Sequence, residues 1–70
     1  MVEKTIELIG TSANSIEEAV ALAVSRASVT LSGIRSATVV ETEALVEEGR
    51  IVGWRVAVKL TFQIKDRLHE

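Results

Sequence analysis

The sequence predicts a small α+β domain whose elements follow the order strand, helix, strand, strand. Two observations predict this class: a capping motif followed by apolar residues at helical spacing, and an unbroken alternation of apolar and polar residues towards the C-terminus. The length of 70 residues adds that the chain forms one domain, residues 1–70, whose own core is marginal.

The first strand is expected over residues 2–9. Ile6 and Leu8 fall on one side of an extended chain and Thr5 and Glu7 on the other, which is the period of a half-buried strand, although Lys4 interrupts the apolar side. Residues 10–12, with the sequence Gly-Thr-Ser, are expected to end this strand as a turn.

The helix is expected to begin at Ser15. Ser15 and Glu18 form a capping box, in which the serine oxygen accepts from a backbone N–H and the glutamate reaches back towards the serine. Gly33 is expected to close the helix in the left-handed conformation. Between these ends, apolar residues recur at spacings of three and four: Ile16, Ala19, Val20, Ala23, Val24, Ala27 and Leu31.

Two long strands are expected over residues 34–47 and 52–64, with a turn at residues 48–50. The last strand is the stronger prediction, because seven apolar residues alternate in it with more polar ones. A three-residue loop centred on Gly49 would keep even residues opposite even ones, and a bulge would break this pattern locally. The expected pairs are Val46 with Val52, Ala44 with Trp54, Val40 with Val58, Ser36 with Phe62 and, on the other face, Glu43 with Arg55.

The lengths of these elements indicate self-association. A strand of fourteen residues would extend ~47 Å at ~3.4 Å per residue, whereas a helix of seventeen residues covers only ~25 Å at ~1.5 Å per residue. Apolar sheet surface is therefore left uncovered, and monomers rarely tolerate a large exposed apolar patch. We expect a closed homo-oligomer. The alternative is a marginal monomer or dimer with a frayed hairpin.

Composition excludes several classes of function. There is no cysteine, and His69 is the only histidine, which excludes thiol chemistry and a histidine-centred metal cage within one chain. A net charge of −2 argues against nucleic acid as a partner. The longest apolar run has six residues, 19–24, so no membrane span is expected, and in the absence of a secretory leader we expect a cytoplasmic protein. No nucleophile–base pair or phosphate loop indicates an enzyme.

The ordered motifs of the chain resemble those of the dodecin family. The resemblance runs from about Lys4 to Ile64 and rests on the set of motifs at these spacings rather than on any one of them. The motifs are residues 6–12 (Ile-Glu-Leu-Ile-Gly-Thr-Ser), 15–18, 26–27, 34–39, 54–56 and 60–62.

The resemblance implies a three-stranded antiparallel sheet wrapped around one helix, and twelve copies in a hollow shell with cubic 23 symmetry. It also implies a storage protein rather than an enzyme. Flavin-binding dodecins hold riboflavin or its nucleotides in pairs at twofold interfaces, where a tryptophan of the second strand stacks on the ring and a glutamine of the third strand hydrogen-bonds to it.

Both signature positions differ in this chain. The tryptophan position falls on Ser36, which has no aromatic face, and the glutamine position falls on Arg55, which donates hydrogen bonds but accepts none. We therefore expect a non-catalytic small-ligand shell close to the flavin-free branch of the family, of which calcium dodecin is an example. The alternatives are a flavin-binding dodecin with a modified pocket, and a calcium-binding dodecin whose ligands the resemblance does not assign.

Each candidate site residue has a functional and a structural interpretation. Trp54 could stack on a planar ligand or belong to the core or an interface. Arg55 could bind an anion, or it could form a cross-strand ion pair with Glu43.

The remaining polar candidates leave the same choice open. Thr11 and Ser12 could hold a phosphate near the helix start, or they could serve as turn and capping residues. His69 is expected in a disordered tail. A group of acidic residues could contribute to a calcium site or lie solvated on the surface: Glu41, Glu43, Glu47 and Glu48.

Overall fold

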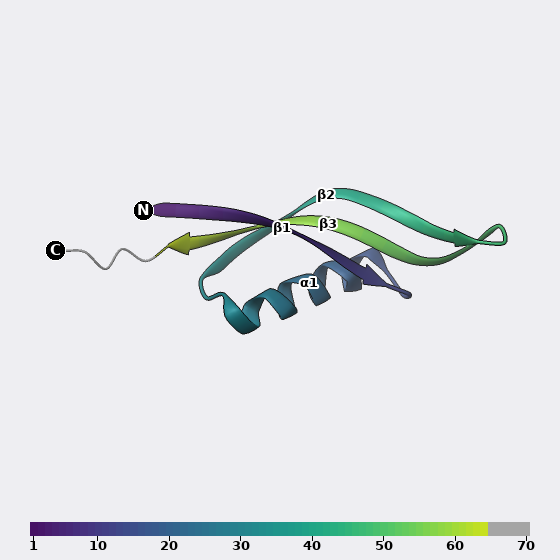
Figure 1. The fold of residues 1–70 in the computed structure, drawn as a ribbon, viewed down its shortest axis with the longest axis horizontal. Helices are drawn as coiled ribbons and strands as arrows, with labels where there is room; N and C mark the ends of the chain where they lie inside the picture. The colour runs from purple at the N-terminus through teal and green to yellow at the C-terminus, as the bar shows by residue number, and fades with distance from the viewer. Residues whose placement is uncertain (65–70) are drawn as a thin grey trace.

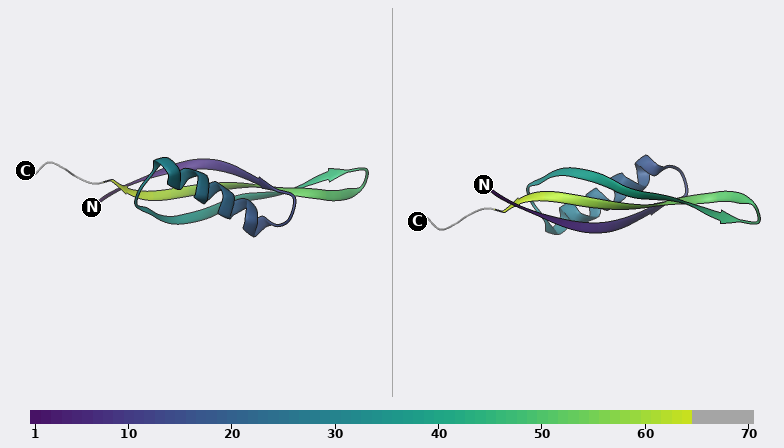
Figure 2. Two further views of the ribbon diagram at one scale, coloured as in Figure 1. Left: turned by 90° about the horizontal axis from the view of Figure 1, so that it is seen from below. Right: turned by 90° about the horizontal axis from the view of Figure 1, so that it is seen from above.

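The computed structural model describes residues 1–64 and consists of one sheet and one helix. The elements are β1 (Val2–Ser12), α1 (Ile16–Thr30), β2 (Ile34–Glu47) and β3 (Arg50–Ile64). The three strands form an antiparallel sheet in the order β1-β3-β2, so that β1 and β2 are both edge strands. Helix α1 lies on one face of this sheet and crosses it diagonally (Figures 1 and 2). The predicted order and class are confirmed.

Strand β1 is longer than predicted, because residues 10–12 continue it instead of turning. Gly10, Thr11 and Ser12 pair with Val56, Arg55 and Trp54 of β3. The glycine serves helix packing: a Cβ at residue 10 would collide with the carbonyl oxygen of Ala19 in α1. A Gly-Thr-Ser sequence that looked like a turn is thus a strand segment pressed against the helix backbone.

The start of α1 confirms half of the predicted capping box. The Oγ of Ser15 accepts from the backbone N–H of Glu18 at 3.0 Å, as predicted. The carboxylate of Glu18, however, accepts from the Ser12 hydroxyl and from Nδ2 of Asn14 instead of reaching back to the Ser15 N–H. The hydrogen bond from Ser12, and after it the one from Asn14, lowers the pKa of Glu18. The Ser15 N–H donates to Ser12 Oγ.

The end of α1 differs from the prediction at Gly33. The helix ends at Thr30, and Leu31 caps it in an extended conformation while its N–H donates to the carbonyl of Ala27 at 2.9 Å. Gly33 does adopt the left-handed region, with φ 77°, but it lies in the connection to β2. Its carbonyl there accepts from the N–H of Gln63 at 3.1 Å, which fixes the connection against β3.

The β2–β3 hairpin turns in two residues, not three. Glu48 and Gly49 both have positive φ, 51° and 76°, as a type I′ turn requires. Glu47 therefore pairs with Arg50. The predicted pairs of Ala44 with Trp54 and Glu43 with Arg55 are confirmed, because an irregularity next to Leu45 absorbs the shift of one residue.

The other predicted pairs are wrong, because the two-residue turn shifts the partner of Val46 and a bulge between Val39 and Glu41 shifts the partners of Val40 and Ser36. Irregularities lie between Val39 and Glu41 and between Ile34 and Ser36. Each leaves one extra residue on β2 and changes which side chains share a face. The observed pairs are Val46 with Ile51, Val39 with Val58 and Ser36 with Thr61.

The core lies between α1 and the centre of the sheet. Val56, Val58 and Leu60 of β3 are fully buried, and they face a helix whose buried residues are all alanine: Ala19, Ala23 and Ala27. Small side chains let the helix approach the sheet closely, as the alanines of the stripe predict.

The helix covers only part of the sheet. The structure measures 60 × 19 × 12 Å, and the hairpin extends well beyond the helix start (Figure 1). Several large apolar side chains of the hairpin stay exposed: Val39, Val40, Val46, Ile51 and Val52. The predicted length mismatch is thus confirmed. Within residues 1–64, no helix has the length and apolarity that crossing a membrane requires.

Candidate ligand-binding face

The face of the sheet opposite α1, which we call the outer face, carries the polar candidates. Two adjacent rows run across all three strands there. Thr11, Arg55 and Glu43 form one row, and Ile9, Ala57 and Glu41 form the next. Alternation along β3 fixes this arrangement, because Val56 and Val58 point to the helix and their neighbours point away.

Arg55 and Glu43 form an ion pair across β3 and β2. Their closest atoms, Nη1 and Oε1, lie 3.9 Å apart, and the side chains are 51% and 60% exposed. Exposed pairs of this kind contribute at most about 1 kcal/mol to stability. This geometry supports the interpretation of Arg55 as one partner of a cross-strand ion pair with Glu43. Because the pair is weak, the guanidinium of Arg55 remains available to a ligand.

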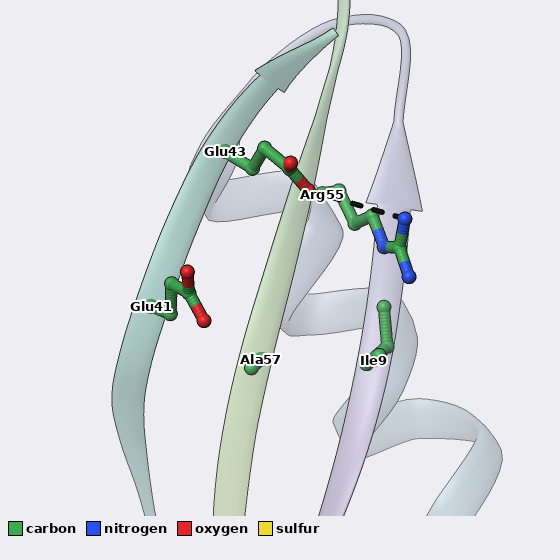
Figure 3. A pocket seen from close by; sticks show the side chains of 5 residues that line it. All are labelled: Ile9, Glu41, Glu43, Arg55 and Ala57. Atoms are coloured by element: carbon green, nitrogen blue, oxygen red, sulfur yellow. Dashed lines mark ion pairs between the residues drawn. The ribbon is translucent and has the colours of Figure 1, made fainter.

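A shallow pocket of about 240 Å³ lies over these two rows. Its floor is apolar, from Ile9 and Ala57, and its charged wall is formed by Arg55, Glu41 and Glu43. Figure 3 shows the Arg55 side chain pointing towards β1, with the two glutamates standing on β2. This set can hold a small ligand by charge and apolar contact. These five residues include no nucleophile paired with a general base.

Ser36 lies on the same outer face as Arg55, but at a distance. It pairs with Thr61, six residues along β3 from Arg55, which places the two side chains ~20 Å apart at ~3.4 Å per residue. The predicted register put Ser36 on the helix side, and the bulge at Val40 moves it to the outer face. One copy of the chain therefore does not bring Ser36 and Arg55 into one site.

Trp54 lies on the opposite face. It alternates with the buried Val56, pairs with Ala44 and Ser12, and is half-buried on the helix side. The interpretation of Trp54 as a core or interface residue fits this position. The structure does not place Trp54 with Arg55, so the three candidate residues do not converge within one chain.

The acidic residues do not gather into a metal site within residues 1–64. Glu41 and Glu43 stand in adjacent rows of the outer face, whereas Glu47 and Glu48 lie at the hairpin turn. No group of three or more carboxylate or imidazole side chains comes together in this part of the chain. Because calcium takes six to eight oxygens, other copies or waters would have to complete any calcium site.

Of the two hydroxyl candidates, Ser12 has a structural role, whereas Thr11 lies in β1 and not in a turn. The Ser12 side chain is buried, and its oxygen accepts from the N–H groups of Asn14 and Ser15 while donating to Glu18. These bonds occupy the hydroxyl and support the capping interpretation. Thr11 is exposed on the outer face next to Arg55. His69 lies outside the described residues.

Ile9 and Ala57 line the pocket but were not predicted as site residues. Their positions follow from the pairing of β1 with β3, which opposes Ile9 and Ala57. The one signal in the sequence was that Ile9 breaks the polar side of β1, where Glu3, Thr5 and Glu7 precede it. Single exposed apolar residues are common on protein surfaces, so this signal alone would not have located the pocket.

The sequence model of the dodecin family matches residues 2–65. This chain belongs to the dodecin family. Its β-α-β-β fold is that of the dodecins: dodecin from Streptomyces coelicolor superposes with a TM-score of 0.87 at 32% identity, covering 93% of both chains. Dodecin from Streptomyces davaonensis gives a TM-score of 0.86 at 28% identity, covering 93% of this chain and 96% of the other.

Calcium dodecin from Mycobacterium tuberculosis is a further relative. It is 36% identical over 64 residues, which cover 91% of this chain and 90% of that protein. Its crystal structure, described as calcium chelating with a novel calcium-binding site, gives a TM-score of 0.80 at 33% identity over the full length of both chains. This dodecin therefore has one reported relative within its family for which calcium binding is described.

Proposed function

We propose that this dodecin is a non-catalytic, cytoplasmic shell of twelve copies that binds or stores a small ligand without the usual flavin site. One observation supports the flavin part: the two positions that the family resemblance assigns to the flavin-contacting tryptophan and glutamine hold Ser36 and Arg55, both on the outer face, and the only tryptophan lies on the other face. A stacked aromatic ring is worth about 1–3 kcal/mol, which is about tenfold to a hundredfold in affinity.

Riboflavin fluorescence tests this proposal. We expect no strong quenching when riboflavin is titrated with the wild-type protein. The double variant Ser36→Trp with Arg55→Gln restores the signature groups and should quench the fluorescence with saturable binding. The matched control is Thr38→Trp with Arg55→Gln, because Thr38 is exposed on the same face of β2 one row away. Strong saturable quenching by the wild type, or an assembled double variant without any gain, would contradict the proposal.

Calcium is the second candidate ligand. It is favoured by the calcium dodecin relative and by the neighbouring carboxylates of Glu41 and Glu43 on the outer face. Since residues 1–64 of one chain do not gather enough carboxylates for a calcium ion, calcium would bind where copies of this face meet.

Thermal melting with added calcium tests the second candidate. Millimolar calcium should raise the Tm of the assembled protein, and chelator should reverse the rise, because a ligand that binds only the folded state stabilises it. Glu41→Gln with Glu43→Gln should abolish the rise, while Glu3→Gln with Glu17→Gln, two exposed carboxylates elsewhere, should keep it. An unchanged Tm at millimolar calcium would remove calcium as the ligand.

A further inference from the structure

A groove runs between α1 and the edge strand β1. It has a volume of about 300 Å³ and is lined by residues 8–11 of β1 and by Leu22, Ala23 and Arg26 of α1. Two of the lining residues, Ile9 and Leu22, are 57% and 42% exposed overall, and Arg26 is the one charged side chain of the lining. The groove lies beside a strand edge whose backbone groups have no neighbouring strand, and proteins usually cover such an edge.

A second uncovered surface is the tip of the β2–β3 hairpin, residues 45–52. β1 ends at Ser12, opposite Trp54, so the tip extends beyond both β1 and α1 (Figures 1 and 2). Val46 and Ile51 form a cross-strand pair at the tip and are 59% and 58% exposed. Glu47 and Glu48 follow Val46 directly, with Arg50 as the one cation of the tip.

We propose that the hairpin tip of one copy docks into the groove of a neighbouring copy; this inference rests on the proposed self-assembly and names its contact. The volume of the groove suits the side chains of Val46 and Ile51. A cavity of about 150 Å³ holds one benzene molecule, and the groove has about twice that volume for the two side chains. The charges fit as well, because the tip carries a net negative charge and the groove carries Arg26.

The two surfaces occupy different places on the chain, so each copy donates one tip and accepts one. In a shell with 23 symmetry, this contact closes either reciprocally between two copies across a twofold axis or as a ring of three copies around a threefold axis. Tip-to-groove docking thereby buries the apolar hairpin that α1 is too short to cover, and it also covers the exposed edge of β1.

Cysteine cross-linking tests the contact, and the chain is suited to it because it has no cysteine of its own. The variant Ile51→Cys with Leu22→Cys should give disulfide-linked species under mild oxidation: dimers for a twofold contact, or dimers and trimers for a threefold contact. Within one chain the two positions lie ~20 Å apart along the long axis, a distance obtained by adding the rise of three strand residues to that of seven helix residues. This separation is well beyond the ~7 Å that a disulfide can span. Each single variant should stay monomeric on a denaturing gel.

The controls separate this contact from other arrangements. Ile51→Cys with Val29→Cys places the second thiol on another exposed apolar side chain of α1 and should give no disulfide-linked species. Dimers from Ile51→Cys alone would show tip-to-tip packing, and cross-linked species with Val29→Cys would show unspecific contact. Either result would overturn the proposal, as would a double variant of Ile51→Cys with Leu22→Cys that does not cross-link. The mass of the wild type separates a failure of the docking contact from a failure of self-assembly. A large particle whose cysteine variants do not give the predicted cross-links refutes only the docking contact. A 7.6 kDa particle refutes self-assembly as well.

Discussion

The carboxylate of Glu18 ties the end of β1 to the start of α1. It accepts from the Ser12 hydroxyl and from Asn14, and the buried Ser12 oxygen in turn accepts from two backbone N–H groups. One serine thus serves the strand that it ends and the helix that follows. This role was not predictable from the capping box, which points Glu18 towards Ser15, because the box does not reveal that β1 delivers a second serine to the same place.

These hydrogen bonds predict a pH-dependent contribution of Glu18 to stability. Because they lower the pKa of Glu18 in the folded state, their contribution is fully present above the ordinary value of 4.5 and is lost as the pH falls through the folded-state pKa. Glu18→Gln should therefore lower the Tm at pH 7, and the gap to wild type should narrow below pH 4.5.

The control for this prediction is Glu17→Gln in the same helical turn, since Glu17 makes no side-chain hydrogen bond within residues 1–64. Its Tm should follow that of the wild type across the same pH range. A Glu18→Gln deficit that stays constant down to pH 3, or a Glu17→Gln variant that behaves alike, would contradict the role of the carboxylate.

At the scale of elements, the parts with strong periodicity were predictable and the parts with weak periodicity were not. The unbroken alternation of β3 predicted which of its side chains face the helix and about where the strand runs, and the stripe of alanines predicted which side of α1 is buried. β2 offers no such pattern: Ala37, Thr38, Val39 and Val40 fit either face, so nothing in the sequence located the bulge at Val40. That bulge decides the face of Ser36, which is why the outer face was not predictable as one surface.

The contact between β1 and α1 predicts a severe effect of a single methyl group. Gly10→Ala would place its Cβ against the backbone carbonyl of Ala19. The atom in the way belongs to the helix backbone, so it cannot move aside as the end of a flexible side chain could. Overpacking of this kind typically costs ~1–3 kcal/mol, and we expect a loss at the upper end. Denaturant unfolding measures it, with Thr5→Ala, an exposed position of the same strand, as the control that should change little. Equal midpoints for the two variants would show that the helix does not lie against Gly10.

For the whole molecule, the length mismatch between β3 and α1 is the property from which assembly follows. Both elements have 15 residues, but a strand rises ~3.4 Å per residue and a helix ~1.5 Å, so one helix shelters less than half of the strand it packs on. The result is a radius of gyration of 15.0 Å, against ~11 Å for a compact chain of this length. The number of copies does not follow from this mismatch, because closure depends on contact angles that a single chain does not contain.

The absolute mass of the protein in solution tests this account most directly. Light scattering at micromolar concentration should give a closed particle far heavier than the 7.6 kDa chain, because self-assembly buries the hairpin apolar surface that the helix leaves open. The family resemblance sets the expected size at about twelve copies. A compact 7.6 kDa monomer that melts cooperatively at the same concentration would contradict the account.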